Sequence, residues 1–342
     1  MRSTDSFIRR KAATAALSVL VCIVVLLMVP QPAAAKNKMV SFFRQMQTRD
    51  NYLIRYGVWP CDRSLKKGTV VLLGGRTEFM EKYSETISEL NHKGFDVYAL
   101  DWRGQGLSSR MLPNRHKGFV KTYDDYMDDL ARFVDTLVKP AAASPIIIMA
   151  HSMGGHVALR YLHDHPGTVA RAVIVSPMID VLTSPVPRML ARLITRWAIS
   201  AGWEDMYAIG NGDYDSGAIK FEGNRLTRDR QRFMVEKKAV EENPDLALGG
   251  VTYGWLSATF ASIEKLTQPG FAAKIRIPVL MVGAESDKIV SIEAQQRTCS
   301  RMGNCRFYLI PDARHEILME TDAVRSIFWD QFDMFIENQD RN

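Results

Sequence analysis

The sequence predicts an α/β fold in which a mostly parallel central sheet is covered by helices on both faces. Short, continuously apolar segments alternate with longer amphipathic ones from about residue 50 to about residue 178, and again after about residue 269. Continuous apolar runs are typical of parallel strands buried on both faces, and their alternation with helices is typical of βαβ units. With 342 residues, 46% of them hydrophobic and 24% charged, the chain has room for one such domain with an insertion.

Each element is predicted from its own pattern. Tyr126, Leu130, Phe133 and Leu137 recur at helical spacing, and Gly94 follows another amphipathic segment, where it predicts a helix end. The predicted strands cover residues 69–73, 95–100, 145–150, 169–175, 277–282 and 306–310. The predicted helices cover residues 79–93, 123–138, a segment from the end of the third strand to about 163, and 323–336.

The alternation stops between about residues 178 and 269. This stretch is too long for an unstructured loop in a compact domain, and tryptophan, tyrosine and phenylalanine are scattered through it. We therefore expect a helical cap at about 179–268, inserted into a single α/β domain over 36–342. The cap is expected to lie over the C-terminal edge of the sheet.

The first 35 residues predict a targeting segment. Arg9, Arg10 and Lys11 precede an apolar stretch, and Ala33-Ala34-Ala35 offers a cleavage site for a signal peptidase. The apolar stretch with its alanine-rich beginning also reaches the length of a spanning helix. A cleaved signal peptide and an uncleaved membrane anchor therefore both remain open. Either one predicts that the rest of the chain is extracytoplasmic, periplasmic or secreted.

Charge and cysteine content narrow the possible partners. The net charge is +6, but residues 1–35 hold four basic residues and one acidic one, which leaves 40 basic and 37 acidic residues in the body. This balance gives no electrostatic footprint for nucleic acid. No cluster of histidine, cysteine and aspartate has metal-ligand spacing, and no organic cofactor is implied. Cys299 and Cys305 could form a disulfide in an oxidising compartment, or could be two free thiols.

A nucleophile is predicted at the end of the third strand. The segment A-H-S-M-G-G places Ser152 between a strand and a helix, the context of a G-x-S-x-G nucleophile elbow. Small residues are needed two positions before and after the serine, and Ala150 and Gly154 occupy them. Alanine in place of the first glycine is a departure, but it adds only one methyl group. Alternatively, Ser152 would only cap the helix.

A serine hydroxyl needs a base, and the base needs an orienting carboxylate. In elbow-containing folds the order along the chain is serine, acid, histidine. Of the seven histidines, only His315 follows the strand after the expected cap, so we assign it as the base. Asp287 follows the fifth strand and is the predicted acid, with Glu285 as the alternative. Asp312 shares a loop with His315 and is interpreted as a turn residue.

The oxyanion intermediate needs two backbone N–H donors. One is predicted at Met153, directly after the nucleophile. The other is expected in the turn Gly74-Gly75-Arg76-Thr77-Glu78 after the first strand, where Arg76 is preferred and Gly75 is the second choice.

Five segments together resemble the monoacylglycerol lipase and lysophospholipase L2 branch of the α/β-hydrolases. In chain order they read G-G-R-T-E-F-M-E-K-Y, D-W-R-G-Q-G-L-S, A-H-S-M-G-G-H, G-A-E-S-D-K-I-V and D-A-R-H-E. The resemblance implies an α/β-hydrolase fold with a Ser152, Asp287, His315 triad and oxyanion donors at Arg76 and Met153. It also implies that residues 101–108 are structural. In this branch the first turn often reads H-G-x-G-E, whereas here Gly74 and Thr77 replace the histidine and the second glycine. Gly74-Gly75-Arg76 is similar to the P-G-R of the lysophospholipase-like members, which favours a lysolipid.

The expected cap contains a basic amphipathic segment at residues 187–200. Arg188, Arg192 and Arg196 recur every four residues beside an apolar stripe. The stripe consists of Met189, Leu190, Leu193, Ile194 and Trp197. Such a helix suits an anionic lipid surface, or it is a lid helix whose charged face is solvated.

Three functions are therefore compared. The first is an esterase that forms an acyl-enzyme on a lipid or small ester, either a lysophospholipid or a monoacylglycerol. The second is a peptidase of the proline-aminopeptidase type, which needs a cap carboxylate for a free amino terminus; Glu204, Asp205, Asp213 and Asp215 are available. The third is a non-catalytic binding protein on the same fold, although no triad member is missing.

Overall fold

An eight-stranded sheet forms the centre of the protein. The computed structural model describes residues 42–62, 66–183 and 186–337, and the predicted targeting segment lies outside them. The strands are β1 (Phe42–Gln47), β2 (Leu53–Trp59), β3 (Gly68–Leu73), β4 (Phe95–Leu100), β5 (Ile146–His151), β6 (Arg171–Val175), β7 (Val279–Ala284) and β8 (Cys305–Ile310). Their order across the sheet is β1-β2-β4-β3-β5-β6-β7-β8. The sheet is parallel from β4 to β8, and β1 and β2 extend it as antiparallel strands.

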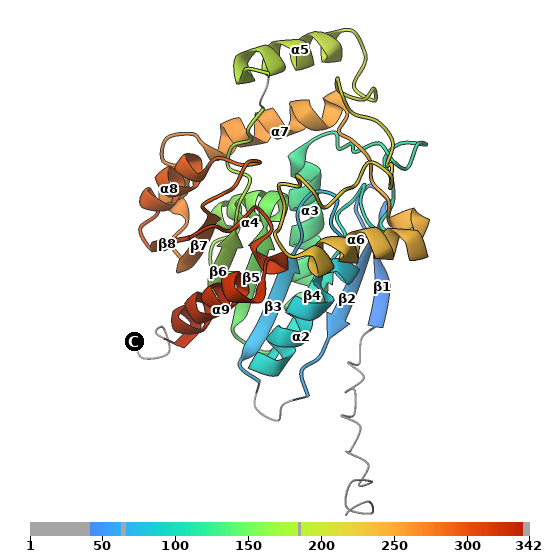
Figure 1. The fold of residues 1–342 in the computed structure, drawn as a ribbon. Coiled ribbons are helices and arrows are strands. Elements are labelled where there is room, and N and C mark those ends of the chain that lie inside the picture. Colours follow the sequence, from blue (N-terminus) through green and yellow to red (C-terminus); the bar gives the residue numbers. More distant parts are fainter. Residues whose placement is uncertain (1–41, 63–65, 184–185, 338–342) are drawn as a thin grey trace, which may run out of the picture. The chain divides into compact units, whose positions relative to one another are not determined.

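Helices cover both faces of the sheet, which confirms the predicted α/β-hydrolase fold class (Figure 1). The longer helices are α2 (Ser84–Lys93), α3 (Tyr123–Phe133), α4 (Ser152–Asp164), α5 (Arg188–Ser200), α6 (Arg230–Glu242), α7 (Tyr253–Leu266), α8 (Ile292–Ser300) and α9 (Asp322–Glu337). On one face, α3, α4 and α8 pack against alternate strand residues such as Val71, Leu73 and Ile148 in one continuous core. On the other face, Phe332 of α9 meets Phe95 of β4 edge to face.

The predicted strands and helices are found with small shifts at their ends. The helix expected at 79–93 begins with a short 3₁₀ turn, η1 (Met80–Tyr83), and ends where Gly94 adopts φ of 99°, a left-handed conformation that favours glycine. The helix expected at 123–138 is α-helical only to Phe133 and continues as a π-helical turn, Val134–Val138. The antiparallel strands β1 and β2 were not predicted.

The segment between β6 and β7 carries three of the helices. Figure 1 shows α7 above the C-terminal ends of the parallel strands and α5 on the side of α7 that faces away from the sheet. Ala198 of α5 is buried in a small cluster with Ala208 and Tyr253. The third helix, α6, reaches the body through Glu236, whose carboxylate lies 3.0 Å from Lys82 Nζ of η1.

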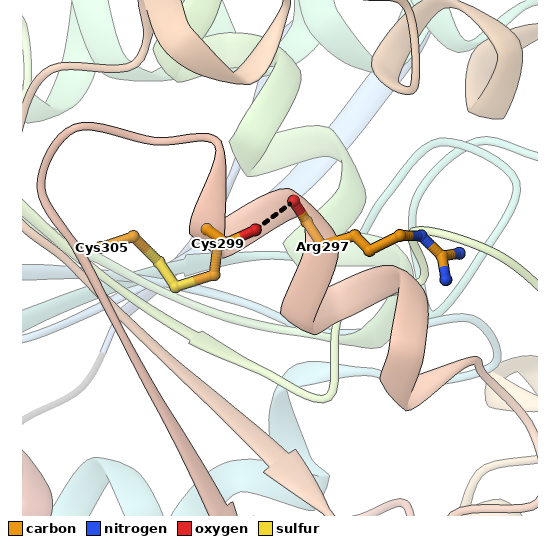
Figure 2. The surroundings of a disulfide bond; sticks show 4 residues. Arg297, Cys299 and Cys305 are labelled. Atoms are coloured by element: carbon orange, nitrogen blue, oxygen red, sulfur yellow. Dashed lines mark hydrogen bonds between the residues drawn. A yellow bond between two sulfur atoms is a disulfide. The ribbon is translucent and has the colours of Figure 1, made fainter.

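A disulfide joins Cys299 and Cys305 (Figure 2). Of the two states that the sequence allows, a disulfide or two free thiols, the structure shows the disulfide. It links the end of α8 to the first residue of β8, so it closes the connection between these two elements. Within the described residues, no helix has both the length and the apolar character needed to cross a bilayer.

Candidate active site

The connection from β5 to α4 places Ser152 at a sharp turn above the sheet. β5 ends at His151, and Ser152 is the first residue of α4. Ser152 has φ of 51°, a backbone conformation that residues other than glycine rarely adopt. A strained serine between a strand and a helix is the geometry of a nucleophile elbow.

Neighbouring small residues permit this turn. A Cβ built on Gly154 would lie 2.5 Å from the carbonyl oxygen of Gly74 and 2.7 Å from that of Leu73. These contacts are far too short, so the position requires glycine. Ala150 is completely buried and pairs with Leu73 and Ile174 on the two neighbouring strands. The extra methyl group of Ala150 is therefore accommodated within the sheet.

Ser152, His315 and Asp287 form one hydrogen-bonded line. His315 Nε2 lies 2.9 Å from Ser152 Oγ, and His315 Nδ1 lies 2.7 Å from Asp287 Oδ2. The three residues come from loops at the C-terminal ends of β5, β7 and β8, and all three are buried. The structure thus brings together three side chains that span 163 positions of the sequence.

Asp287 is arranged to remain ionised. Its Oδ1 accepts hydrogen bonds from the backbone N–H groups of Ile289, at 2.8 Å, and Val290, at 3.1 Å. Burial raises the pKa of the Asp287 carboxyl, but the hydrogen bond and charge of His315 and these backbone donors hold it below its usual value. A carboxylate in this position fixes the imidazole orientation and stabilises an imidazolium.

The other acids near the triad are placed elsewhere. Glu285 is exposed and accepts a hydrogen bond from the backbone N–H of Asp312 at 2.9 Å. Asp312 has φ of 60°, as expected for a turn residue. Glu285 and Asp312 therefore stabilise each other's loops, and Asp287 is the carboxylate bonded to His315.

The turn after β3 lies directly against the nucleophile. A Cβ on Gly75 would be 3.1 Å from the Ser152 Cβ, so a larger side chain here would crowd Ser152. The Gly75 N–H already donates to the Glu78 carboxylate, and the Thr77 N–H donates to Gln105 Oε1 at 3.3 Å. Because its N–H is already bonded, Gly75 is disfavoured as the second oxyanion donor. The N–H of Arg76, the residue between Gly75 and Thr77, remains as the preferred donor.

Met153 provides the other predicted donor. It occupies the second position of α4, where a backbone N–H has no acceptor within the helix. The residue before the helix, His151, gives it no side-chain cap. The Met153 N–H is therefore available at a helix N-terminus, where developing negative charge is stabilised.

Residues 101–108 support the oxyanion turn, as the resemblance implied. Gln105 Nε2 donates to the Gly75 carbonyl at 3.0 Å, and the Trp102 indole donates to the Gly74 carbonyl at 2.8 Å. Both side chains are buried. They hold the turn by the carbonyl oxygens of Gly74 and Gly75.

A buried charge network beneath the triad was not predicted. The Glu78 carboxylate accepts hydrogen bonds from Tyr83 and from the Gly75 N–H, and lies 3.1 Å from His151 Nδ1. His151 Nε2 lies 3.2 Å from the His315 carbonyl oxygen. Glu78 and His151 thus connect the oxyanion turn to the backbone of the base.

Charge pairing shifts the pKa values in this network. Burial alone would raise the pKa of Glu78, but His151 and Lys82 lower it well below its usual value. Burial alone would lower the pKa of His151, but Glu78 raises it. Lys82 also pairs with Glu316 at 2.7 Å, so the network reaches the residue that follows the base.

Comparisons with known proteins identify the family of this chain. The family model described as serine aminopeptidase, S33 matches residues 64–322. Lysophospholipase L2 of Escherichia coli (strain K12) is 35% identical over 266 residues, which cover 75% of this chain and 77% of that protein. The probable lysophospholipase L2 of Haemophilus influenzae is 31% identical over 85% of this chain and 92% of its own length.

The chain belongs to this S33-type family of α/β-hydrolases. A solved structure of a soluble variant of monoglyceride lipase from Saccharomyces cerevisiae, in complex with a substrate analog, superposes with a TM-score of 0.70. It is 19% identical and covers 90% of this chain and 99% of the lipase, so it supports the shared fold. Within the described ranges, no group of three or more His, Cys, Asp or Glu side chains is placed to hold a metal ion.

Proposed function

We propose that this protein is a serine esterase that cleaves the acyl ester of a lysophospholipid or a monoacylglycerol. The observation that carries the proposal is the hydrogen-bonded line from Ser152 Oγ through His315 to Asp287. Two of the relatives are named lysophospholipase L2 and monoacylglycerol lipase, and these names support a carboxylic ester as substrate.

In the first half of the reaction, Ser152 Oγ attacks the ester carbonyl while His315 Nε2 takes the hydroxyl proton. The carbonyl oxygen becomes an oxyanion, which the backbone N–H groups of Met153 and Arg76 stabilise. Collapse of this intermediate releases the glycerol-containing alcohol, which receives the proton from His315. The fatty acyl group remains on Ser152.

In the second half, water replaces the alcohol. His315 Nε2 removes a proton from the water as its oxygen attacks the acyl carbonyl, and the same N–H donors stabilise the second oxyanion. The Ser152 oxygen leaves and takes the proton back from His315. The products are a fatty acid and the free enzyme, and Asp287 stays ionised throughout.

A peptidase is the second candidate, because the family description includes serine aminopeptidases. Such an enzyme needs a free carboxylate near the nucleophile to hold an amino terminus. The four acids considered from the sequence are all exposed: Glu204, Asp205, Asp213 and Asp215. Asp213 is bound to Tyr207 and Asn114. Glu236 reaches the buried network, but Lys82 pairs with it. These placements favour the esterase.

A lipid panel tests the proposal. The wild type and Ser152→Ala would be assayed with lysophospholipids, monoacylglycerols and a proline anilide. We expect ester hydrolysis by the wild type and a loss of at least about 10⁴-fold in Ser152→Ala. Faster cleavage of the anilide would favour the peptidase. No turnover of any substrate, together with no labelling by a fluorophosphonate, would favour a binding protein.

We also propose that α5 docks on a lipid surface. Four members of its apolar stripe are exposed, led by Met189 at 77% and Trp197 at 60%, with Leu190 and Leu193 beside them. Figure 1 shows α5 as the outermost helix of the segment that covers the sheet edge. A contiguous exposed apolar surface of this kind is typical of a membrane or protein contact.

The arginines of α5 contribute unequally to such docking. Arg188 is paired with Asp180, and Arg192 lies 2.7 Å from Glu264. Arg196 is exposed beside Trp197 and, among the described residues, has no ion-pair partner. We therefore expect apolar insertion to dominate the interaction and net attraction to anionic lipid to be modest.

We further propose that the body of the protein is extracytoplasmic. The Cys299–Cys305 disulfide supports this, because such bonds persist in oxidising compartments. Cell fractionation with thiol labelling tests it: the body should separate from cytoplasmic markers, and Cys299 should react with a maleimide only after reduction. Labelling of Cys299 in unreduced cells, with the protein among the cytoplasmic markers, would contradict it.

A further inference from the structure

The side chain of Arg76 is half-buried and has no counter-charge in the described chain. Its Nη2 donates to the Gly249 carbonyl at 2.5 Å, and its guanidinium lies 5.5 Å from the centre of the Trp255 ring. Its Nε is buried and has no hydrogen-bond partner. Among the described residues, no carboxylate lies within ion-pair distance of Arg76. Burial lowers the pKa of Arg76 to about 10, which leaves it charged at neutral pH.

Among the described residues, Arg55 and Arg103 are more deeply buried than Arg76, and both are paired with acids. Arg103 binds Asp129 at 2.6 Å and Asp50 at 2.8 Å, and Arg55 binds Asp101 at 3.1 Å as well as Glu81. Burying a guanidinium without an anion is costly. Within the described part of the chain, Arg76 and Arg110 lack such a partner, and of these two Arg76 follows the glycine that lies against Ser152. An anion from outside the chain that lies beside Ser152 would complete the Arg76 site.

Arg76 is also close to the reacting atoms. It directly follows Gly75, which contacts Ser152, and its own N–H is the proposed oxyanion donor. Its guanidinium extends to Gly118 and Gly249, two loops that do not belong to the triad. In a lysophospholipid, the acyl ester and the phosphate are attached to the same glycerol. An ester held at Ser152 thus brings its phosphate to the same end of the sheet as Arg76.

We propose that the Arg76 guanidinium binds the phosphate of the substrate and selects lysophospholipids over neutral monoacylglycerols. This inference rests on the proposed esterase function. Nε and an Nη group of arginine can donate two parallel hydrogen bonds to phosphate oxygens, and a partly desolvated site strengthens them. The phosphate of a lysophospholipid would accept a hydrogen bond from the buried Nε of Arg76. A neutral glyceride has no phosphate and leaves Nε without a partner.

Arg110 provides a matched control, because it resembles Arg76 in all but position. Burial also lowers the pKa of Arg110 to about 10, and its Nε and Nη1 are unpartnered. Its Nη2 donates to the carbonyls of Asp245 and Ala247, in the same segment that Arg76 holds through Gly249. If Arg76 only fastened this segment, losing either arginine would have the same consequence.

The experiment compares kcat/KM for a short-chain lysophospholipid and a monoacylglycerol with the same acyl chain, in wild type, Arg76→Gln, Arg76→Lys and Arg110→Gln. We expect Arg76→Gln to lower the phospholipid-to-glyceride ratio by about ten- to a hundredfold, whatever it does to the common rate. Arg76→Lys should recover part of the ratio, and Arg110→Gln should not change it. An unchanged ratio in Arg76→Gln, or an equal change in Arg110→Gln, would overturn the proposal.

Inhibition separates the lipid headgroup from free phosphate. sn-Glycerol 3-phosphate and inorganic phosphate would be tested as competitors in wild type and Arg76→Gln. Competition that disappears in Arg76→Gln supports the site, and stronger competition by glycerol phosphate assigns it to the headgroup. Equal inhibition of both proteins would contradict it.

Binding to the Ser152→Ala protein separates this inference from the proposed function. If Ser152→Ala binds glycerol phosphate through Arg76 while the wild type hydrolyses no ester, the phosphate site stands and the esterase proposal fails. If the wild type hydrolyses only monoacylglycerols and no protein binds glycerol phosphate, the esterase stands and the phosphate site fails.

Discussion

The sheet and the segment between β6 and β7 differ in how much of their apolar surface is buried. The five strands β3 to β7 are buried almost throughout, and the loops at their C-terminal ends, with that of β8, hold the triad and the oxyanion turn. The inserted segment instead carries α5, where Leu193 and Trp197 are more than half exposed. In the proposed function, the chemistry would depend on the buried sheet, whereas access of the substrate would depend on the exposed surface of α5.

Replacing the acid should have the largest effect if the core fixes the chemistry. Asp287→Asn keeps the shape but presents the wrong hydrogen-bonding group to His315 Nδ1, so kcat should fall by about 10⁴-fold. Glu285→Gln is the matched control, because Glu285 lies two residues away and its side chain accepts a hydrogen bond from the backbone N–H of Asp312. Steady-state kinetics on a short ester would measure both. Similar losses in both variants would break the assignment of the acid.

Charging the exposed stripe of α5 tests the other region. Leu193→Glu with Trp197→Glu should lower partition into anionic vesicles by at least about tenfold, because apolar burial is lost and like charges repel. Ser200→Glu with Ala201→Glu adds the same charge at the exposed end of the helix. Co-sedimentation with vesicles measures the difference. If both pairs weaken binding equally, charge alone matters and the stripe does not insert.

Removing the disulfide should affect stability more than chemistry. Cys299→Ser with Cys305→Ser opens a loop with a sequence separation of 6, which corresponds to about 2 kcal/mol in a chain-entropy model. Denaturant unfolding of this variant and the oxidised wild type measures the loss. A variant as stable as the wild type would show that α8 and β8 hold together by packing alone.

The smallest expected effect concerns pH. Because Glu78 raises the folded-state pKa of His151, protonation of His151 stabilises the fold below its unfolded pKa of about 6.5, and this contribution is lost as pH rises through the raised value. Because the pKa of Glu78 is lowered, its carboxylate stays ionised at mildly acidic pH and continues to pair with His151. The stability deficit of His151→Gln should therefore shrink between pH 6 and pH 9 in denaturant unfolding. A constant deficit would mean that His151 is neutral.

The core could be predicted because its signals are local. Apolar runs mark the buried strands, and the A-H-S-M-G-G segment combines strand, turn and helix within a few residues. β1 lacks such a signal: it is an edge strand with Phe42 and Phe43 exposed, so its sequence shows no buried face. Edge strands of this kind are recognised only through their pairing.

Other features could not be predicted because they join distant parts of the chain. Glu78 and His151 are 73 positions apart, and no local pattern pairs a turn carboxylate with the residue before a nucleophile. The one local signal for this network was Glu78, which occupies the position of the final Glu in a turn of the H-G-x-G-E type. In α5 the spacing predicts an apolar stripe but not which side faces the body. Thr195 and Ala198 are buried there, whereas most of the stripe is not.

Identifying the residue that a fluorophosphonate modifies tests the central claim most directly. Peptide mapping by mass spectrometry should find one adduct, on the peptide that contains Ser152, formed in step with the loss of esterase activity. Labelling should be absent in Ser152→Ala and greatly slowed in His315→Gln. An adduct at another residue, or complete inhibition with Ser152 unmodified, would contradict the account.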